Sequence, residues 1–389
     1  MVGMDVKLVA AVASVGLNVR EFCREQGISP STFYKWRARF DAGGLDGLVE
    51  RSRRPARSPG LIDSAVEDAI VRVRKELTER CVDAGAHTIW FHLREVGVSA
   101  PAPSTIWRVL TRRGLIEPTP AKRPKSSLRR FEYARPNECW QIDATHWQLA
   151  DGSGVEIIDI IDDHSRLIVA AGVVAPTATS PAAWATLVDA ASSWGLPARV
   201  LSDNGLAFNG SRRGHHVLFE TNLRAVGVQP IASTPFHPQT CGKIERFHQT
   251  LKKWLAGQPP AATVADLQAA LDAFIDYYNR TRPHRGANRR PPLEKWSATP
   301  PAGPANEPLT RPTRIHHQTV SSGGHVNIHP WHIGVGSKWI GQHVTIIVQH
   351  HHAVIFHNHT IIRELTINPA RTYQPIAPVH DVSRHKRAR

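Results

Sequence analysis

The first 60 residues carry an apolar pattern with the spacing of short helices. Phe33, Trp36 and Phe40 recur at intervals of three and four residues, which puts them on one face of a helix. Ser29 is a favoured cap for this helix and Pro30 a favoured first residue. Its other face is polar and basic, with Ser31, Thr32, Tyr34, Lys35 and Arg37. A helix, a glycine-containing turn and a polar, basic helix predict a helix-turn-helix domain over residues 1–60, with those five residues toward DNA.

Residues 61–116 repeat part of this pattern. The sequence PSTIWRVLTRRG echoes PSTFYKW of the first unit, and Arg108 and Arg112 fall on its outer face. We predict a second helix-turn-helix or winged-helix-like domain there, although a chance match of three residues is the alternative. Residues 117–136 are rich in Pro, Lys and Arg, which predicts an extended basic linker.

From Cys139 the apolar period changes from that of helices to that of strands. WQIDATHWQL, VEIIDIIDDHS and RLIVAAGVVA predict three consecutive antiparallel strands joined by turns. PAAWATLVDAASSWG follows as an amphipathic helix, and ARVLSDNG and VQPIAST as short strands among further helices. The pattern predicts an α/β domain over residues 137–297.

The remaining chain is predicted to be a β-rich end. Residues 298–312 hold five prolines, which predicts a linker. HVTIIVQ, AVIF and TIIREL read as strands of a small β-barrel over residues 313–375, followed by a basic tail, 376–389. Thirteen of the 22 histidines fall beyond the linker. Their spacing matches no metal-binding motif, so we favour surface or DNA-facing histidines over a metal site.

Charge divides the chain into three parts. The net charge of +15 is made up of +9 over residues 1–130, zero over 131–300 and +6 over 301–389. Two basic ends around a neutral middle indicate a nucleic-acid partner. No apolar run approaches the roughly 20 residues of a membrane helix, so we expect a cytoplasmic, nucleoid-associated protein. The four cysteines form no C-x-x-C pair and indicate neither a zinc site nor a disulfide framework.

Three acidic residues stand at positions suited to chemistry. Asp143 lies inside the first predicted strand, Asp203 at the end of the fourth, and Glu245 near the start of a helix. A charge within an apolar strand is costly unless it is paired or bound to metal. Clustered carboxylates repel one another, and divalent cations relieve that repulsion. Oxygen ligands select Mg²⁺ or Mn²⁺, and two such ions support phosphoryl transfer.

Four segments carry a family resemblance. WQIDAT, LSDNGLAF, HPQTCGKIERFHQTLKKW and YYNRTRPHRGANRRPPLEKW resemble the integrase core of bacterial insertion-sequence transposases, relatives of retroviral integrases, over residues 131–297. The resemblance implies a ribonuclease-H-like fold and a DDE triad, on Asp143, Asp203 and Glu245, that is catalytic and binds two Mg²⁺ or Mn²⁺ ions. It also implies recognition of terminal inverted repeats and target DNA by a homo-oligomer, release of a 3′-OH, and strand transfer. The 41 residues between Asp203 and Glu245 exceed the family's usual interval, and Cys241 stands where asparagine is common.

Polar residues around Glu245 are candidate phosphate contacts. They are Lys243, Arg246, Gln249 and Lys252, and Arg280, Arg282, His284 and Arg285 follow on the next segment. Solvated helix residues are the alternative for each of them. For the whole chain, DNA cleavage and strand transfer is the function that we expect. The rivals are a nuclease that only hydrolyses, and an inactive or domesticated transposase that acts as a sequence-specific DNA-binding regulator.

Overall fold

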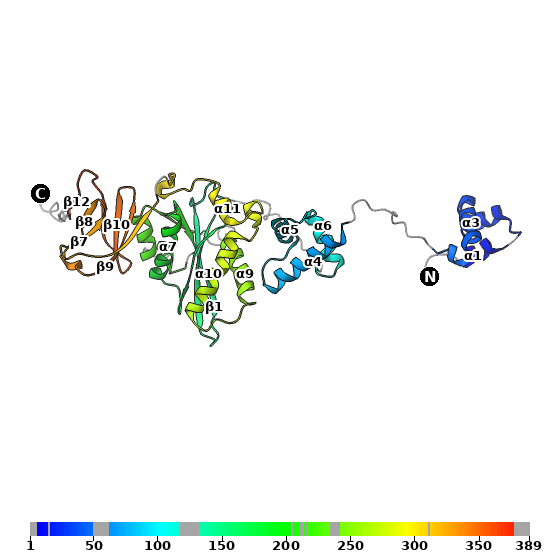
Figure 1. The fold of residues 1–389 in the computed structure, drawn as a ribbon, viewed down its shortest axis with the longest axis horizontal. Coiled ribbons are helices and arrows are strands. Elements are labelled where there is room, and N and C mark those ends of the chain that lie inside the picture. The colour runs from blue at the N-terminus through cyan, green and yellow to red at the C-terminus, as the bar shows by residue number, and fades with distance from the viewer. Residues whose placement is uncertain are drawn as a thin grey trace. The chain divides into compact units, whose positions relative to one another are not determined.

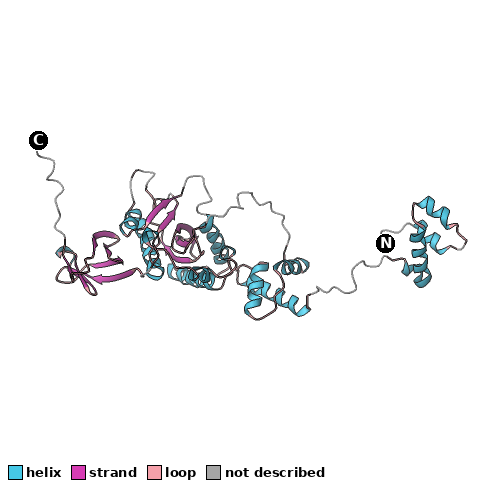
Figure 2. Ribbon diagram, turned by 90° about the horizontal axis from the view of Figure 1, so that it is seen from above, coloured by secondary structure: helices cyan, strands magenta, loops and turns pink. Residues whose placement is uncertain are grey.

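We analysed a computed structural model of the chain. It describes residues 6–14, 16–49, 62–116, 132–203, 205–210, 214, 217–233, 242–309 and 312–376. Its contacts divide the chain into two compact units, residues 1–62 and 63–389. In Figure 2 the helices of the N-terminal third are cyan, and the strands of the remaining chain are magenta. Among the described residues, no helix is both long and apolar enough to cross a membrane.

The first unit contains three helices, as the apolar spacing predicts: α1 (Val6–Ala13), α2 (Val19–Gln26) and α3 (Pro30–Gly47). The backbone N–H of Thr32 donates to the Ser29 side chain, which confirms the predicted cap, and Pro30 opens α3. Phe33 is fully buried against α1 and α2. Gly27 ends α2 in the left-handed conformation, where its lack of a Cβ permits the sharp turn into α3.

The second unit opens with three more helices: α4 (Ser64–Glu79), α5 (Ala86–Glu95) and α6 (Pro103–Arg112). The segment PSTIWRVLTRRG, predicted as the second copy of the helix-turn-helix pattern, is therefore helical through Arg112, and Pro103 lies in the first turn of α6. Ile89, Ile106 and Leu110 are completely buried between the three helices. Arg113 and Arg112 at the end of α6 bind Glu67 of α4 at 2.6 and 2.5 Å, which ties the first and third helices together.

A five-stranded mixed sheet forms the middle of this unit. Its strands are β1 (Trp140–Gln148), β2 (Gly154–Asp162), β3 (Ile168–Val174), β4 (Arg199–Ser202) and β5 (Gln229–Ala232). They lie in the order β3-β2-β1-β4-β5. The predicted meander β1–β2–β3 is antiparallel, whereas β4 and β5 join it in parallel. Strands β1 and β4 are therefore neighbours, as the family resemblance implies.

Helices cover both faces of this sheet, α7 on one side and α9 and α10 on the other in Figure 1. They are α7 (Ser180–Trp194), α8 (Leu218–Ala225), α9 (Gly242–Leu255), α10 (Val264–Arg280) and α11 (Pro292–Ser297), with short 3₁₀ turns at Arg285–Ala287, Pro304–Asn306 and Ser337–Trp339. Ile158 and Ile160 of β2 pack toward α7, whereas Ile157 and Ile161 pack toward α9 and α10. Because strand side chains alternate, each face acquires its own apolar core.

The C-terminal strands form two sheets rather than the predicted closed barrel. The strands are β6 (Arg314–Thr319), β7 (His325–Ile328), β8 (Trp331–Gly334), β9 (His343–Gln349), β10 (His352–His357), β11 (Thr360–Thr366) and β12 (Tyr373–Gln374). One sheet has the order β11-β10-β9-β6 and the other β12-β8-β7. No strand pairing joins the two sheets across the described residues, so hydrogen bonding does not close a barrel.

The C-terminal strands also share a core with the central domain. Phe356 of β10 packs on Trp184 of α7, with ring centroids 5.1 Å apart. Asn222 of α8 donates a hydrogen bond to the His359 carbonyl, and the backbone N–H of Leu196 donates to Thr313. Apolar burial therefore connects the two regions that flank the predicted linker, residues 298–312.

Candidate active site

Asp143 lies in the middle of β1, on the face that α9 covers. Its cross-strand partner in β2 is Asp159, so two carboxylates stand opposite each other on one face. One Asp143 oxygen accepts from the backbone N–H of Ala144 at 2.8 Å, and the other lies 3.8 Å from His248 Nδ1. The side chain is about one quarter exposed (23%), which leaves it accessible at the edge of the site.

Asp203 follows the end of β4, next to β1 in the sheet. The backbone N–H of Gly205 donates to its carboxylate at 2.8 Å and fixes the turn that leaves the strand. A Cβ at Gly205 would approach that carboxylate to 2.8 Å, so glycine leaves room for it. The parallel pairing of β1 and β4 brings Asp203 close enough to Asp143 for their charges to interact.

The electrostatics of Asp143 reflect this crowding. Burial is the main cause that raises the pKa of Asp143, to about 6. The charges of Asp203 and Asp159 raise this pKa further, whereas His248 and the Ala144 N–H lower it. A carboxylate that is hard to ionise among its neighbours is one that a cation would stabilise. The oxygen donors of this cluster thus fit a divalent hard cation.

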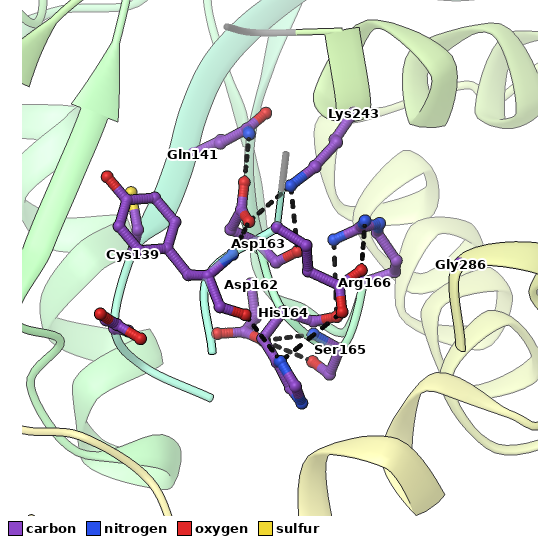
Figure 3. Close-up of polar contacts among 12 residues, drawn as sticks. Cys139, Gln141, Asp162, Asp163, His164, Ser165, Arg166, Lys243 and Gly286 are labelled. Carbon is purple, nitrogen blue, oxygen red and sulfur yellow. Dashed lines mark hydrogen bonds and ion pairs between the residues drawn. The ribbon is translucent and has the colours of Figure 1, made fainter. Parts of the chain in front are cut away.

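Glu245 lies in the first turn of α9 and is exposed. The two residues just before Glu245 make polar contacts with the sheet and with the turn after β2. Lys243 Nζ binds the Asp163 carboxylate at 2.5 Å, and the backbone N–H of Ile244 donates to the Gln141 side chain at 3.4 Å. Figure 3 shows Gln141 and Lys243 converging on Asp163 from two sides. The start of α9, and with it Glu245, is held by polar contacts to β1 and to the turn after β2.

The turn after β2, the predicted DDHS segment, is itself a polar network (Figure 3). The Asp162 carboxylate accepts from the Ser165 backbone and hydroxyl at 2.7 and 2.6 Å, and from the Asn137 backbone at 2.8 Å. Arg166 binds Glu132 at 2.8 Å, and Lys295 binds the same carboxylate. The turn is thereby fixed to the segment before β1 and to α11. The sequence predicts the turn but none of these pairings.

A second polar pair lies beneath α9. His248 Nε2 is 3.0 Å from an oxygen of Asp159, which is completely buried. Burial raises the pKa of Asp159, and His248 opposes that rise. Asp159 was not among the predicted site residues, although one signal marks it: Val155, Ile157 and Ile161, which face the same way in β2, are all apolar.

The predicted phosphate contacts on α9 divide into two groups. Arg246, Gln249 and Lys252 are exposed, and Arg246 donates to Gln249 at 3.0 Å. Lys243, by contrast, forms an ion pair with Asp163, and burial lowers the pKa of Lys243. On the following segment, Arg282 is paired with Asp83 of the α4–α5 turn and lies over Tyr278. Lys243 and Arg282 are thus paired within the protein, so a DNA contact by either would compete with that pair, and both stay predictions.

The predicted DNA-reading residues of the helical domains are mostly on the surface. Ser31, Tyr34 and Lys35 are exposed on α3, and Thr32 is half-buried. Arg37 is also half-buried and donates to the Ser14 carbonyl at 3.0 Å.

On α6, both predicted readers are exposed and already contact other residues. Arg108 donates to Thr105 of its own helix at 3.0 Å, and Arg112 is paired with Glu67. A DNA contact by Arg112 would compete with that pair.

The three predicted metal ligands do not form a compact group in the structure. Asp143 and Asp203 interact electrostatically, because the charge of Asp203 helps to raise the pKa of Asp143. Within the described parts of the chain, no group of three or more His, Cys, Asp and Glu side chains is close enough to hold a metal ion. The assignment of the triad therefore stays a prediction.

Comparison with known proteins bears on this site. Residues 134–238 and 226–292 each match an integrase core domain family, and these ranges include all three predicted acidic residues. Residues 6–56 match a helix-turn-helix domain and residues 32–110 a homeodomain-like domain. A 10.0 kDa protein of insertion element IS407 from Burkholderia multivorans is 40% identical over 74 residues, which are 19% of this chain and 71% of that protein.

The chain belongs to the integrase-core family of insertion-sequence transposases. A 39.2 kDa protein of insertion element IS476 from Xanthomonas euvesicatoria is 26% identical over 176 residues, which are 45% of this chain. This chain covers 49% of that relative, and smaller shares of the longer viral polyproteins that also match. The solved catalytic core of BIV integrase aligns over 42% of this chain and 95% of its own, with 25% identity and a TM-score of 0.33.

Proposed function

We propose that this transposase-family chain cuts DNA at the terminal inverted repeats of an element and joins the freed 3′-OH ends to target DNA. The observation that best supports this is the pair Asp143 and Asp203, on neighbouring strands β1 and β4 of an integrase core domain. Their mutual repulsion and the raised pKa of Asp143 favour occupation by cations. A glutamate at the start of the covering helix, Glu245, completes the ligand set.

Two Mg²⁺ or Mn²⁺ ions would be held by Asp143, Asp203 and Glu245. Bound there, they supply activation of the attacking oxygen and stabilisation of the leaving one. The chain's own residues hold the DNA: Arg246, Gln249 and Lys252 present donors along the exposed face of α9, beside Glu245. This arrangement needs no side chain as general base.

Sequence recognition belongs to the helical domains in this proposal. The helix-turn-helix matches and the exposed polar residues of α3 support reading of element ends by residues 6–49. We propose that the second helical domain binds the same ends, and that the protein acts as a homo-oligomer on DNA, as is usual for transposases of this family. Both proposals follow from the family membership.

A joining assay tests the function. The full chain is incubated with labelled duplexes of the element's own ends, supercoiled plasmid and Mg²⁺, and junctions are sequenced. We expect end cleavage and joined products with Mg²⁺ or Mn²⁺, little activity with Ca²⁺, and none with chelator. Asp143→Asn, Asp203→Asn and Glu245→Gln should each abolish both products and leave end binding intact, because each removes a charged ligand but keeps its shape.

The rivals give different results. Hydrolysis without joined products would identify a nuclease. Specific end binding with neither product, unaffected by the three substitutions, would identify a DNA-binding regulator. A variant that retained wild-type strand transfer would show that its residue is not a metal ligand.

A further inference from the structure

Asp159 occupies a position in β2 at which an apolar side chain is expected. Its neighbours on the same face of β2, Ile157 and Ile161, pack into the apolar core beneath α9 and α10. Asp159 is itself completely buried, and neither of its carboxylate oxygens has a good hydrogen bond within the described residues. A buried carboxylate with so little compensation is destabilising, and an isoleucine or valine would fit the strand better. Such a residue is more readily explained by function than by stability.

His248 is the polar group that reaches Asp159. It stands among Ile244, Phe247 and Leu251 on the buried face of α9 and is itself 9% exposed. Its Nε2 lies 3.0 Å from Asp159 in β2, and its Nδ1 lies 3.8 Å from Asp143 in β1. One ring therefore touches both strands and lies between a buried carboxylate and a predicted metal ligand.

The same ring is one turn along α9 from Glu245. Residues three apart lie on adjacent positions of one helix face, so the location of His248 determines where Glu245 stands over the sheet. The Lys243–Asp163 pair holds the start of α9 from the other side. Two polar contacts thus fix the helix at either side of Glu245, one before it and one after it.

We propose that Asp159 and His248 are positioning residues, which hold α9 over β1 and so set the separation of Glu245 from Asp143 and Asp203 at which metal ions bind. This inference rests on the proposed function. Asp159 orients the imidazole, and the imidazole connects the strand that carries Asp143 to the helix that carries Glu245. Residues that orient metal ligands in this way usually affect metal affinity strongly when replaced.

The experiment measures Mn²⁺ binding by the full chain, from the free-Mn²⁺ signal in electron paramagnetic resonance, together with the melting temperature in chelator. Removal of His248 alone leaves a buried charge and can unfold the protein. The main variant is therefore the double change Asp159→Val and His248→Leu, which leaves no buried polar group unpaired. We expect this variant to melt no lower than wild type but to bind Mn²⁺ about 10–100-fold more weakly.

Two further variants make the test specific. His248→Gln keeps a donor near the position of Nε2, so we expect it to retain most of the Mn²⁺ affinity. His146→Gln is the matched control, because His146 Nδ1 lies 3.0 Å from Glu156 on the same pair of strands, and strand alternation puts His146 on the opposite face from Asp143. It should bind Mn²⁺ as wild type does.

Three outcomes are decisive. Wild-type Mn²⁺ affinity in the double variant would overturn the inference and leave Asp159 and His248 as packing residues. Equal losses in His248→Gln and the double variant would also overturn it, because the contact to Asp159 would then not matter. If Asp143→Asn, in a chain that keeps Asp159 and His248, does not weaken Mn²⁺ binding relative to wild type, the proposed function fails at its metal site, independently of His248.

Discussion

Asp143 combines an ionisable side chain with a largely buried position in β1, and this has a cost in the metal-free protein. An aspartate in an unfolded chain loses its proton near pH 4, whereas burial raises the pKa of Asp143 to about 6 in the folded chain. Between these values the folded protein binds more protons than the unfolded one. Its free energy of unfolding therefore falls as the pH rises from about 4 to about 6.

The change Asp143→Asn should remove this loss. In chelator at pH 7 we expect the variant to be more stable than wild type, by up to about 3 kcal/mol, with the advantage shrinking toward pH 4. Urea unfolding at several pH values measures it. Asp151→Asn is the control, because Asp151 is exposed and its hydrogen bonds with Ser153 lower its pKa. An equal gain in both variants would show that burial of Asp143 is not the cause.

At the scale of elements, the position of α9 depends on the contact between Lys243 and Asp163. Asp163 is 2% exposed, so Lys243→Met leaves its charge without its ion-pair partner. We expect a loss of about 3 kcal/mol in the free energy of unfolding. Lys252→Met, an exposed change on the same helix, should stay within about 0.5 kcal/mol of wild type. Similar unfolding curves for the two variants would contradict this role.

For helix α3 we predict a different effect, because its exposed polar face is the proposed DNA contact. Lys35→Ala should weaken binding to the cognate end by about 1–3 kcal/mol if Lys35 reads a base, with little change in stability. Arg37→Ala should weaken binding and also lower the melting temperature, because Arg37 donates to the Ser14 carbonyl. Fluorescence anisotropy and thermal unfolding separate the two effects. If both variants bound all sequences as wild type does, α3 would not be the reading helix.

For the whole molecule, the charge distribution and the division into two units both suggest that the N-terminal unit contributes to DNA binding. Residues 1–62 form their own unit and carry ten basic and six acidic residues. Phosphate contacts release counterions, so a chain of residues 63–389 should show a shallower salt dependence of DNA binding than the full chain. It should also lose preference for element ends. A titration of salt with one cognate and one unrelated duplex measures both. An unchanged preference would move end recognition to the second unit.

The sequence alone was enough to predict the elements and the kind of site. Helix and strand periods mark the helices of both N-terminal helical domains and the strands that carry Asp143 and Asp203, because local spacing records which face is buried. The motif around Glu245 indicates the family, which the comparisons confirm. The cap at Ser29 could be read for the same reason, since it depends on residues three apart.

Only the tertiary structure decided which residues are paired. Asp159 with His248, Asp163 with Lys243, and Asp83 with Arg282 are separated by about 80 residues or more along the chain. No local period records such pairs, because they depend on the strand register and on the packing of helices against the sheet. For this reason the sequence did not show that Arg282 and Lys243, which we predict to contact DNA, pair with Asp83 and Asp163 in the fold. The prediction of a closed C-terminal barrel was wrong for a similar reason. Strand alternation shows that strands are present, but packing decides which strands pair across a long interval of sequence.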